Sequence, residues 1–266
     1  MATIKDIYQY IDSFAPFETQ MDFDNAGFLV GWEQANVETV LVALDITLPV
    51  IREAVDMGAQ LIVAHHPVIF NPIKRVSDAS VTGEKILLMA ENRIGAICAH
   101  TNLDAAQGGV NERLAERLGL TGLSHLHPDG EDREGRTYGI GRVGTLNLNA
   151  PLDTKAFAEK VKRDLNASGV RYADVGKPVC RVAVGGGACG SMLQDAIAAG
   201  CDTFVTADVK YDVFLQAMER GINLLDAGHF ATEDIVIQPL VEMLQAAFPQ
   251  ISVAKSQVHK EVFASI

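Results

Sequence analysis

The segment VETVLVALDITLPVIREAVDMGAQLIVAHH, residues 37–66, decides the fold that we expect for this chain. Its two apolar runs, residues 37–45 and 61–66, are short enough to be buried strands. The stretch between them has helical periodicity, with Thr47 as a capping residue at its start and Gly58 at its end. The segment therefore predicts a strand, a helix and a second strand, which is the unit from which parallel sheets are built.

The same alternation extends on both sides of this unit. A helix is expected to open at Thr3, with Asp6 as its capping-box partner, and to stop at Pro16. After the unit, we expect a helix, a strand and another helix at residues 83–93, 95–100 and 109–119. This order predicts a mainly parallel sheet.

The second half of the chain repeats the pattern. It predicts helices and strands in alternation, with helices at residues 153–169, 191–200 and 209–221 and strands at 180–184, 201–208 and 222–228. An ancient duplication would explain the likeness of the halves, and so would the generic similarity of such units. The expected fold class is α/β, with two interlinked α/β domains whose mainly parallel or mixed sheets are flanked by helices.

The boundary between the domains is expected where the periodic pattern is lost. Residues 121–137 are rich in acidic residues, Gly and Pro, which is typical of a segment that crosses between domains. We therefore expect one domain at residues 1–126 plus 229–266, carrying most of the candidate metal ligands, and a second at 127–228.

Composition excludes some classes of function. A net charge of −12 at pH 7, without a run of Lys or Arg, argues against binding to a nucleic-acid backbone, although a small anionic substrate remains open. No apolar run reaches the roughly 18 residues of a membrane span, and the first residues lack a signal-peptide pattern, so we expect a cytoplasmic protein. Its four cysteines have no CxxC spacing and are expected to be small buried residues in a reducing compartment.

Four of the seven histidines fall at predicted carboxyl ends of strands, where open parallel sheets bind ligands: His65, His66, His100 and His229. In HFATE, a helix would place His229 and Glu233 one turn apart on the same face, which suits a shared metal ion. HTNLD can do the same with His100 and Asp104.

Adjacent residues of a strand point in opposite directions, so His65 and His66 reach one site only if the chain bends there, as Pro67 permits. They could then serve two ions.

Simpler roles are open for the same residues. A strand-end histidine is usually hydrogen-bonded or solvated, Asp104 could cap a turn, and Glu233 could be a helix-start carboxylate stabilised by the helix dipole. These roles are compatible with metal binding. The other three histidines are expected at the surface: His125, His127 and His259. The turn GGGACG, residues 185–190, could cradle a phosphate, although it matches neither the dinucleotide nor the P-loop fingerprint.

Five motifs carry a resemblance to a known family: FDNAGFLVG, AHHPVIFNPIKR, AHTNLDAAQGGVNERLA, GGGACGSM and DAGHFATE. In this order they resemble the dinuclear-metal family of type 2 homologues of GTP cyclohydrolase I, related to the NGG-interacting-factor-like proteins. The resemblance covers residues 4–263 and corresponds to a short form without the inserted domain of some members. It implies a toroidal hexamer of two-domain subunits, each with two divalent metal ions.

The resemblance also implies roles for single residues. His65 and His66 resemble ligands of different ions, Asp104 a ligand of one, His229 a ligand of the other, and Glu233 a bridge between both. His100 resembles a histidine near the metals that is a candidate catalytic residue rather than a ligand. The sequence departs from many relatives at Ala207, where they have glycine, often with a neighbouring glutamate, so Asp208 is a candidate shorter substitute.

Two main hypotheses for function follow. The first is a dinuclear-metal-dependent hydrolase, GTP cyclohydrolase-like by resemblance, in which the ions lower the pKa of a bound water that attacks a small-molecule substrate, with a nucleotide as one candidate. Imidazole and carboxylate ligands suit iron, zinc or manganese. The second is a non-catalytic ring that binds or delivers metal or acts as a scaffold. A third, weaker hypothesis is a nucleotide-regulated module that uses the GGGACG turn.

Overall fold

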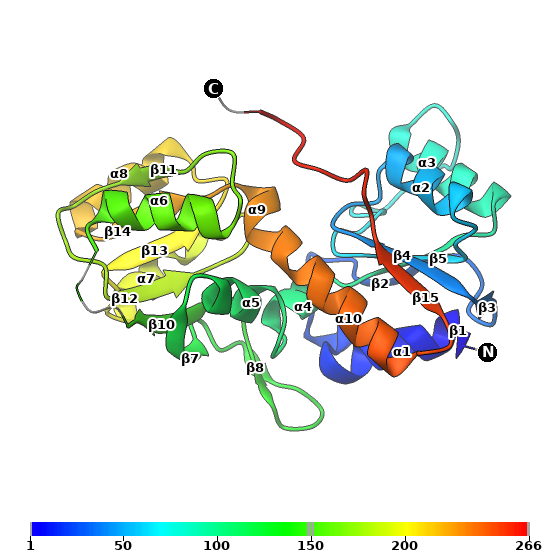
Figure 1. Cartoon of the computed structure of the whole chain (residues 1–266), viewed down its shortest axis with the longest axis horizontal. Coiled ribbons are helices and arrows are strands. Elements are labelled where there is room, and N and C mark those ends of the chain that lie inside the picture. Colours follow the sequence, from blue (N-terminus) through cyan, green and yellow to red (C-terminus); the bar gives the residue numbers. More distant parts are fainter. Residues whose placement is uncertain (1, 148–149, 151, 265–266) are drawn as a thin grey trace. The chain divides into compact units, whose positions relative to one another are not determined.

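The computed structural model describes residues 2–147, 150 and 152–264, which form two compact units (Figure 1). The first unit comprises Met1–Leu103 and Val236–Lys260, and the second comprises Asp104–Ile235 and Glu261–Ile266. The expectation of two α/β domains with mixed sheets is confirmed, but the boundaries between them differ from the expected ones.

The first unit is built on a five-stranded sheet in the order β15-β4-β5-β6-β2. Its strands are β2 (Gly27–Val30), β4 (Thr39–Ala43), β5 (Leu61–Ala64), β6 (Gly95–Cys98) and β15 (Ser252–Lys255). All neighbours run parallel except β2, which pairs antiparallel with β6 at the edge. A small antiparallel pair, β1 (Ala2–Thr3) and β3 (Asn36–Val37), accompanies it.

Helices cover both faces of this sheet (Figure 1). They are α1 (Ile4–Phe14), α2 (Leu48–Asp56), α3 (Val81–Glu91) and α10 (Ile237–Ala247), with the 3₁₀ helix η1 (Phe17–Thr19). The predicted caps are present, because the Thr47 side chain accepts a hydrogen bond from the Val50 N–H at 3.3 Å and Thr3 forms a capping box with Asp6. The unit β4-α2-β5 confirms the strand, helix and strand predicted from residues 37–66.

The second unit is built on a six-stranded sheet in the order β11-β14-β13-β12-β10-β7. The central strands β12 (Arg181–Val184), β13 (Thr203–Thr206) and β14 (Asn223–Asp226) are parallel. Three strands that the sequence did not predict join antiparallel: β7 (Leu120–His125), β10 (Arg142–Leu146) and β11 (Arg171–Ala173).

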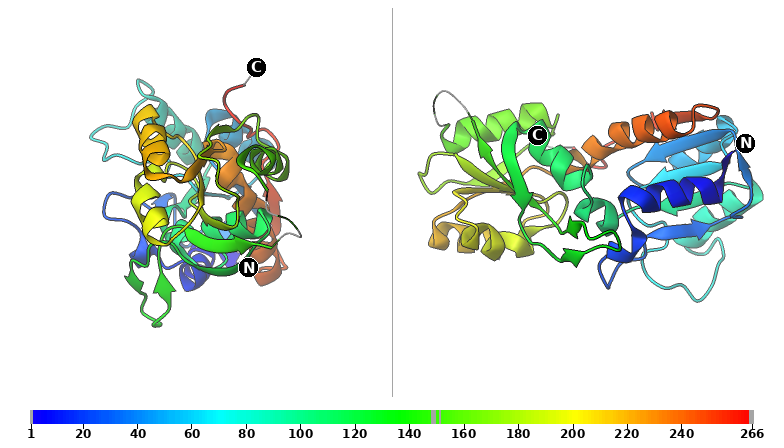
Figure 2. Two further views of the ribbon diagram at one scale, coloured as in Figure 1. Left: turned by 90° about the vertical axis from the view of Figure 1, so that its left-hand side faces the viewer. Right: turned by 90° about the horizontal axis from the view of Figure 1, so that it is seen from below.

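Helices also cover both faces of the second sheet (Figure 2). Side chains of α5 (Val110–Arg117) and α6 (Thr154–Asp164) join one buried cluster with alternate residues of β12, such as Val182 and Val184. Residues of α7 (Leu193–Ala198) and α8 (Tyr211–Arg220) join a separate cluster with the intervening Ala183. The remaining short helices are α4 (Thr101–Ala105), α9 (His229–Glu233), η2 (Gly190–Met192) and η3 (Asp234–Val236).

The expected crossing at residues 121–137 is wrong. Strand β7 pairs with β10 there, and the hairpin of β8 (Gly130–Glu131) and β9 (Thr137–Tyr138) follows within the second unit. The acidic composition reflects a surface hairpin, whereas burial of Leu114 and Leu120 with the second core decides which unit this segment joins. Of the five predicted metal ligands, His65 and His66 therefore lie in the first unit and the other three in the second.

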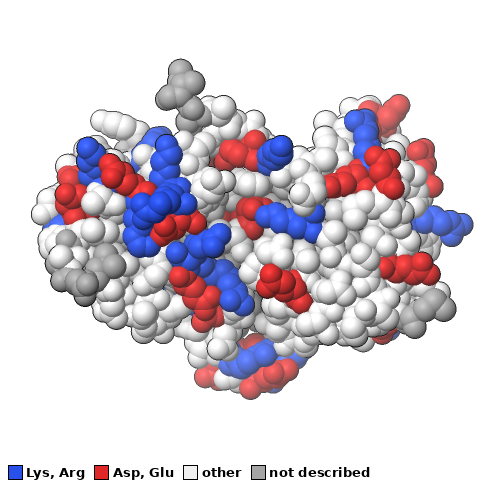
Figure 3. Space-filling model, in the orientation of Figure 1, with Lys and Arg blue, Asp and Glu red and all other residues white. Residues whose placement is uncertain are grey.

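The charged side chains do not segregate on the face drawn in Figure 3, where Lys and Arg atoms are interspersed with Asp and Glu atoms. Helix α6 illustrates this pattern, because Lys160 and Arg163 both form ion pairs with Asp164. Within the described residues, no helix combines the length and apolar character that crossing a membrane requires.

Candidate metal-binding clusters

Three histidines form an imidazole cluster in the first unit, just after the carboxyl ends of β5 and β6. The ring centroids of His65 and His66 are 4.9 Å apart, and that of His100 lies 5.1 Å and 5.4 Å from them. One ring nitrogen from each residue lies within 4.8 Å of the others. The chain bends at His65 and His66 themselves, which confirms that both imidazoles can reach one place.

The environment of His65 defines which of its nitrogens can bind a metal. Its side chain is fully buried, and Nδ1 lies 2.8 Å from the carbonyl oxygen of Ala99. A carbonyl oxygen only accepts hydrogen bonds, so Nδ1 must carry the hydrogen and a neutral ring keeps its lone pair on Nε2. Metal-binding histidines have this arrangement, with the second nitrogen donating to an oxygen.

The other two histidines of the cluster are held in the same way, by carboxylates. His66 Nδ1 lies 2.8 Å from Asp45 Oδ1, and His100 Nδ1 lies 2.8 Å from Asp24 Oδ1. Asp24 also accepts hydrogen bonds from the Thr101 N–H at 3.0 Å and from the Thr101 hydroxyl at 2.5 Å. Both rings therefore have a fixed orientation with Nδ1 as donor.

Both of these carboxylates are ionised at neutral pH. Burial opposes ionisation of Asp24, but hydrogen bonds from His100 and Thr101 outweigh it and lower its pKa to about 2. Burial likewise opposes ionisation of Asp45, and hydrogen bonds from His259 and His66 outweigh it, so its pKa is well below the usual range. Neither Asp24 nor Asp45 was predicted as a site residue, although Asp45 follows a strand end and Asp24 lies in the FDNAG motif.

Asp104, His229 and Glu233 form a carboxylate cluster in the second unit. Asp104 and Glu233 are 8% and 3% exposed, and one carboxylate oxygen of each lies within 4.8 Å of the other. Two buried carboxylates at this separation repel each other, and a bound cation would offset the repulsion. The donor set is thus chemically suited to a divalent cation.

His229 lies between two carboxylates within this unit. Helix α9 places its Nε2 3.0 Å from Glu233 Oε2, as the HxxxE spacing predicted, while Nδ1 lies 2.7 Å from Asp208 Oδ2. A neutral imidazole has one N–H and can donate to only one of them, so the other contact needs a second proton or a cation. Asp208, whose role the sequence left open, therefore orients His229 from a left-handed backbone conformation with φ of 51°.

The GGGACG turn lies against Glu233. A Cβ added to Gly187 would lie 2.1 Å from Glu233 Oε1 and 3.2 Å from His229 Nε2, and Gly187 has φ of +62°. Only glycine combines this conformation with so close an approach. The turn thus shapes the surroundings of the carboxylate cluster.

Protein groups already accept hydrogen bonds from several N–H groups of this turn, which argues against the hypothesis that it cradles a phosphate. The N–H of Gly186 donates to Asn111 Oδ1 at 2.8 Å, and that of Gly187 donates to the Thr232 hydroxyl at 3.0 Å. The N–H of Cys189 donates to the carbonyl of Gly187 at 2.9 Å. A phosphate cradle needs such donors to face the ligand.

Two further residues of the second unit influence the carboxylate cluster, the buried Arg142 and the half-buried Cys189. Arg142, 3% exposed, donates from Nη2 to the carbonyls of Ala105 and Ala106 at 3.2 Å and 3.1 Å, and so fixes the chain after Asp104. Burial, with the charges of Asp104 and Glu233, raises the pKa of the Cys189 thiol well above its usual range. Cys189 therefore stays a neutral thiol near two acids.

The predicted surface histidines have different environments. His127 is exposed as expected, with a side chain that is 51% accessible, and His125 is half-buried in β7. The prediction for His259 is wrong, because its side chain is 5% exposed and its Nε2 lies 2.9 Å from Asp45 Oδ2. All four cysteines carry free thiols, two of them buried and two half-buried.

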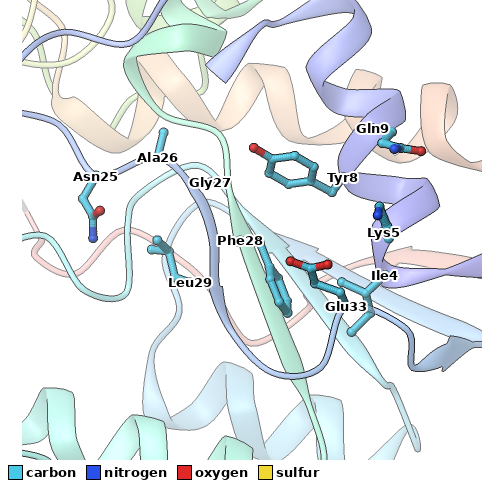
Figure 4. A pocket seen from close by; sticks show the side chains of 10 residues that line it. All are labelled: Ile4, Lys5, Tyr8, Gln9, Asn25, Ala26, Gly27, Phe28, Leu29 and Glu33. Atoms are coloured by element: carbon cyan, nitrogen blue, oxygen red, sulfur yellow. The ribbon is translucent and has the colours of Figure 1, made fainter. Parts of the chain in front are cut away.

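Two cavities have no residue of either cluster in their lining. One, of about 510 Å³, lies in the first unit, and Figure 4 shows Tyr8 of α1 extending toward β2 across it. The other, of about 360 Å³, is lined by Lys155 and Lys162 of α6 and by Tyr172 of β11. The candidate chemistry therefore rests on the two residue clusters and not on either cavity.

Comparison with known proteins agrees with the motif resemblance. Named relatives include a "GTP cyclohydrolase 1 type 2 homolog" of Clostridium acetobutylicum, 32% identical over 251 residues that cover 94% of this chain and 92% of the relative. A protein of the same name from Streptomyces coelicolor is 35% identical over 256 residues, covering 95% of this chain and 87% of the relative.

Solved structures share the fold over the whole chain. A Bacillus cereus protein related to NIF3 superposes with a TM-score of 0.92 at 27% identity, covering 100% of this chain and 99% of that one. A Staphylococcus aureus hypothetical protein superposes with a TM-score of 0.91 at 28% identity, covering 99% of each chain. The family model described as Duf34/NIF3 (NGG1p interacting factor 3) matches residues 2–262, and this chain therefore belongs to the Duf34/NIF3 family.

Proposed function

We propose that this protein is a metal-dependent hydrolase that binds divalent ions through its imidazole and carboxylate clusters. The observation that carries the proposal is the shared arrangement of four histidines. In His65, His66, His100 and His229, Nδ1 lies 2.7–2.8 Å from an oxygen acceptor. Such an outer oxygen fixes the ring and increases the basicity of the other nitrogen, which would prepare His65, His66 and His229 to bind metal and His100 to accept a proton.

The ligand set supports a first-row divalent metal. Imidazole and carboxylate donors suit iron, zinc or manganese. Two ions per subunit, with Glu233 shared between them, stay a prediction from the family resemblance.

The residues of the chain suggest how hydrolysis would proceed. When bound, a divalent ion supplies Lewis acidity to the reacting water and to a substrate oxygen. His100 would accept the proton of the attacking water at Nε2, while Asp24 holds the Nδ1–H and stabilises the imidazolium that forms. The exposed ring of Phe70 lies 6.1 Å from that of His100 and offers an apolar surface beside the proton acceptor.

The name of the curated relatives makes GTP the first substrate to test. Opening its purine ring needs hydrolytic attack on the imidazole moiety, which is a reaction of the proposed class. Protein purified without added metal should be analysed for metals and then assayed with GTP, other nucleotides and cyclic amides. Turnover that a chelator abolishes and metal restores supports the proposal.

The alternative function is a non-catalytic metal-binding or metal-delivering ring or scaffold. It predicts stoichiometric metal without turnover of any substrate in the panel.

If His100→Ala leaves all hydrolysis at the wild-type rate, the assigned role of His100 is wrong.

A further inference from the structure

We infer that His259, in the segment 256–260, is a positioning residue that acts through Asp45 to hold His66 ready for metal. The inference rests on the proposed function, because it requires His66 to be a ligand. It concerns a side chain that the sequence pattern assigned to the surface.

The contacts form a chain of three side chains within the first unit. Asp45 Oδ1 accepts from His66 Nδ1 at 2.8 Å, and Asp45 Oδ2 accepts from His259 Nε2 at 2.9 Å. The two imidazoles use different oxygens, so both hydrogen bonds can exist together. Because His259 is 5% exposed and Asp45 is 39% exposed, the buried imidazole restrains a carboxylate that would otherwise turn toward water.

The backbone explains why His259 reaches Asp45. Strand β15 runs parallel to β4 with Lys255 opposite Val42, so the residues after both strands emerge at the same edge of the sheet. The N–H of Ser256 donates to the Val42 carbonyl at 2.8 Å and extends this pairing by one step. Asp45 follows β4 as His259 follows β15.

Helix α2 anchors the turn that carries His259. The hydroxyl of Ser256 donates to Glu53 Oε2 at 2.5 Å, and the N–H of Gln257 donates to Glu53 Oε1 at 2.8 Å. The N–H of His259 then donates to the Ser256 hydroxyl at 3.2 Å. These contacts fix the segment that leads to His259, which pre-organises the imidazole for Asp45.

The consequence for metal binding follows from the orientation of His66. With Asp45 held, the His66 Nδ1–H has a fixed acceptor and Nε2 stays directed at the imidazole cluster. Without His259, the carboxylate of Asp45 gains rotational freedom. Part of the free energy of metal binding must then go into ordering Asp45 and His66.

Titration of the metal-free protein with Co²⁺ tests this inference. The affinity from chelator competition and the visible spectrum of bound Co²⁺ are measured for wild type, His259→Ala, His259→Gln and the control Gln257→Ala. Loss of a direct outer partner typically costs about 10–100-fold in metal affinity, so we expect about tenfold weakening and an altered spectrum for His259→Ala. His259→Gln should stay within about twofold, because its amide N–H can donate to Asp45.

Two further comparisons make the result decisive. Gln257→Ala should bind like wild type, since that side chain donates to the Lys255 carbonyl at 2.9 Å rather than to Asp45. In an Asp45→Asn background, His259→Ala should have little further effect, because both changes interrupt one chain of contacts.

The outcomes separate this inference from the proposed function. If His259→Ala lowers the melting temperature but keeps the wild-type Co²⁺ affinity and spectrum, the role of His259 is structural and the inference is overturned, while the proposed function stands. If wild type and His66→Ala titrate identically with Co²⁺, His66 is no ligand and the inference is overturned, whereas a wild type that binds no Co²⁺ at all overturns the proposed function as well.

Discussion

Replacing Gly187 by alanine tests whether the position of Glu233 controls metal binding. The added Cβ would lie 2.1 Å from Glu233 Oε1 and 3.1 Å from its Cδ. Favourable separations between heavy atoms begin near about 3.5 Å, so the carboxylate must move by roughly 1 Å or more. Functional groups need placement within about 0.5 Å, and this shift exceeds that tolerance.

A matched control separates this clash from backbone strain. Gly200 lies in the same unit and has φ of +71°, but nothing lies within 4 Å of an added Cβ. A left-handed conformation costs an alanine roughly 1–2 kcal/mol, so both variants should lose a few degrees of melting temperature. Only Gly187→Ala should also lose metal, by about tenfold or more in affinity.

The assay is Zn²⁺ affinity by chelator competition alongside thermal unfolding followed by circular dichroism. Equal Zn²⁺ affinity in Gly187→Ala, Gly200→Ala and wild type would refute the placement of Glu233 in a metal site, whatever the two melting temperatures are.

Three other outcomes are expected. His66→Ala should reduce bound metal measured by plasma emission, whereas the exposed His127→Ala should retain it; equal metal content would remove His66 from the ligand set. Light scattering should give a hexamer, and a mass near 28.6 kDa, that of one chain, would contradict the family-based assembly. The pKa of Asp24 falls from 3.8 to about 2 on folding, so the folded state binds fewer protons than the unfolded state. Ionised Asp24 therefore stabilises the folded state by about 2 kcal/mol. This stabilisation is lost as pH falls from about 4 to 2. Urea unfolding should therefore show a deficit for Asp24→Asn at pH 6 that shrinks toward pH 2, and a constant deficit would contradict this.

Local patterns predicted the elements that position the candidate ligands. The apolar runs at β4, β5 and β6 and the cap at Thr47 follow from periodicity, and the strand-end rule placed His65, His66 and His100 at one edge. The HxxxE spacing placed His229 and Glu233 one turn apart because a helix fixes that geometry.

The supporting contacts could not be predicted because they join distant parts of the chain. Asp24 and His100 are 76 residues apart, and Asp45 and His259 are 214 residues apart. Local pattern also misplaced the domain boundary, because the antiparallel strands β7 and β10 are defined by pairing with each other rather than by a strong period of their own.

The close approach of Gly187 to Glu233 appears only in three dimensions. Sequence alone suggested a phosphate-binding turn there. A glycine run before a helix occurs in phosphate-binding turns and also where the backbone packs closely against a side chain, as here.

The most direct test of metal binding counts ions per chain in wild type and in Glu233→Gln. The variant keeps the volume of the side chain but loses the charge that would offset repulsion between neighbouring cations, which two-metal sites hold about 3.5–4 Å apart. Metal analysis against protein determined by amino-acid analysis should give two ions per wild-type chain and at most one in the folded variant. A wild-type chain that holds no metal, or a variant that holds two ions tightly, would contradict the account.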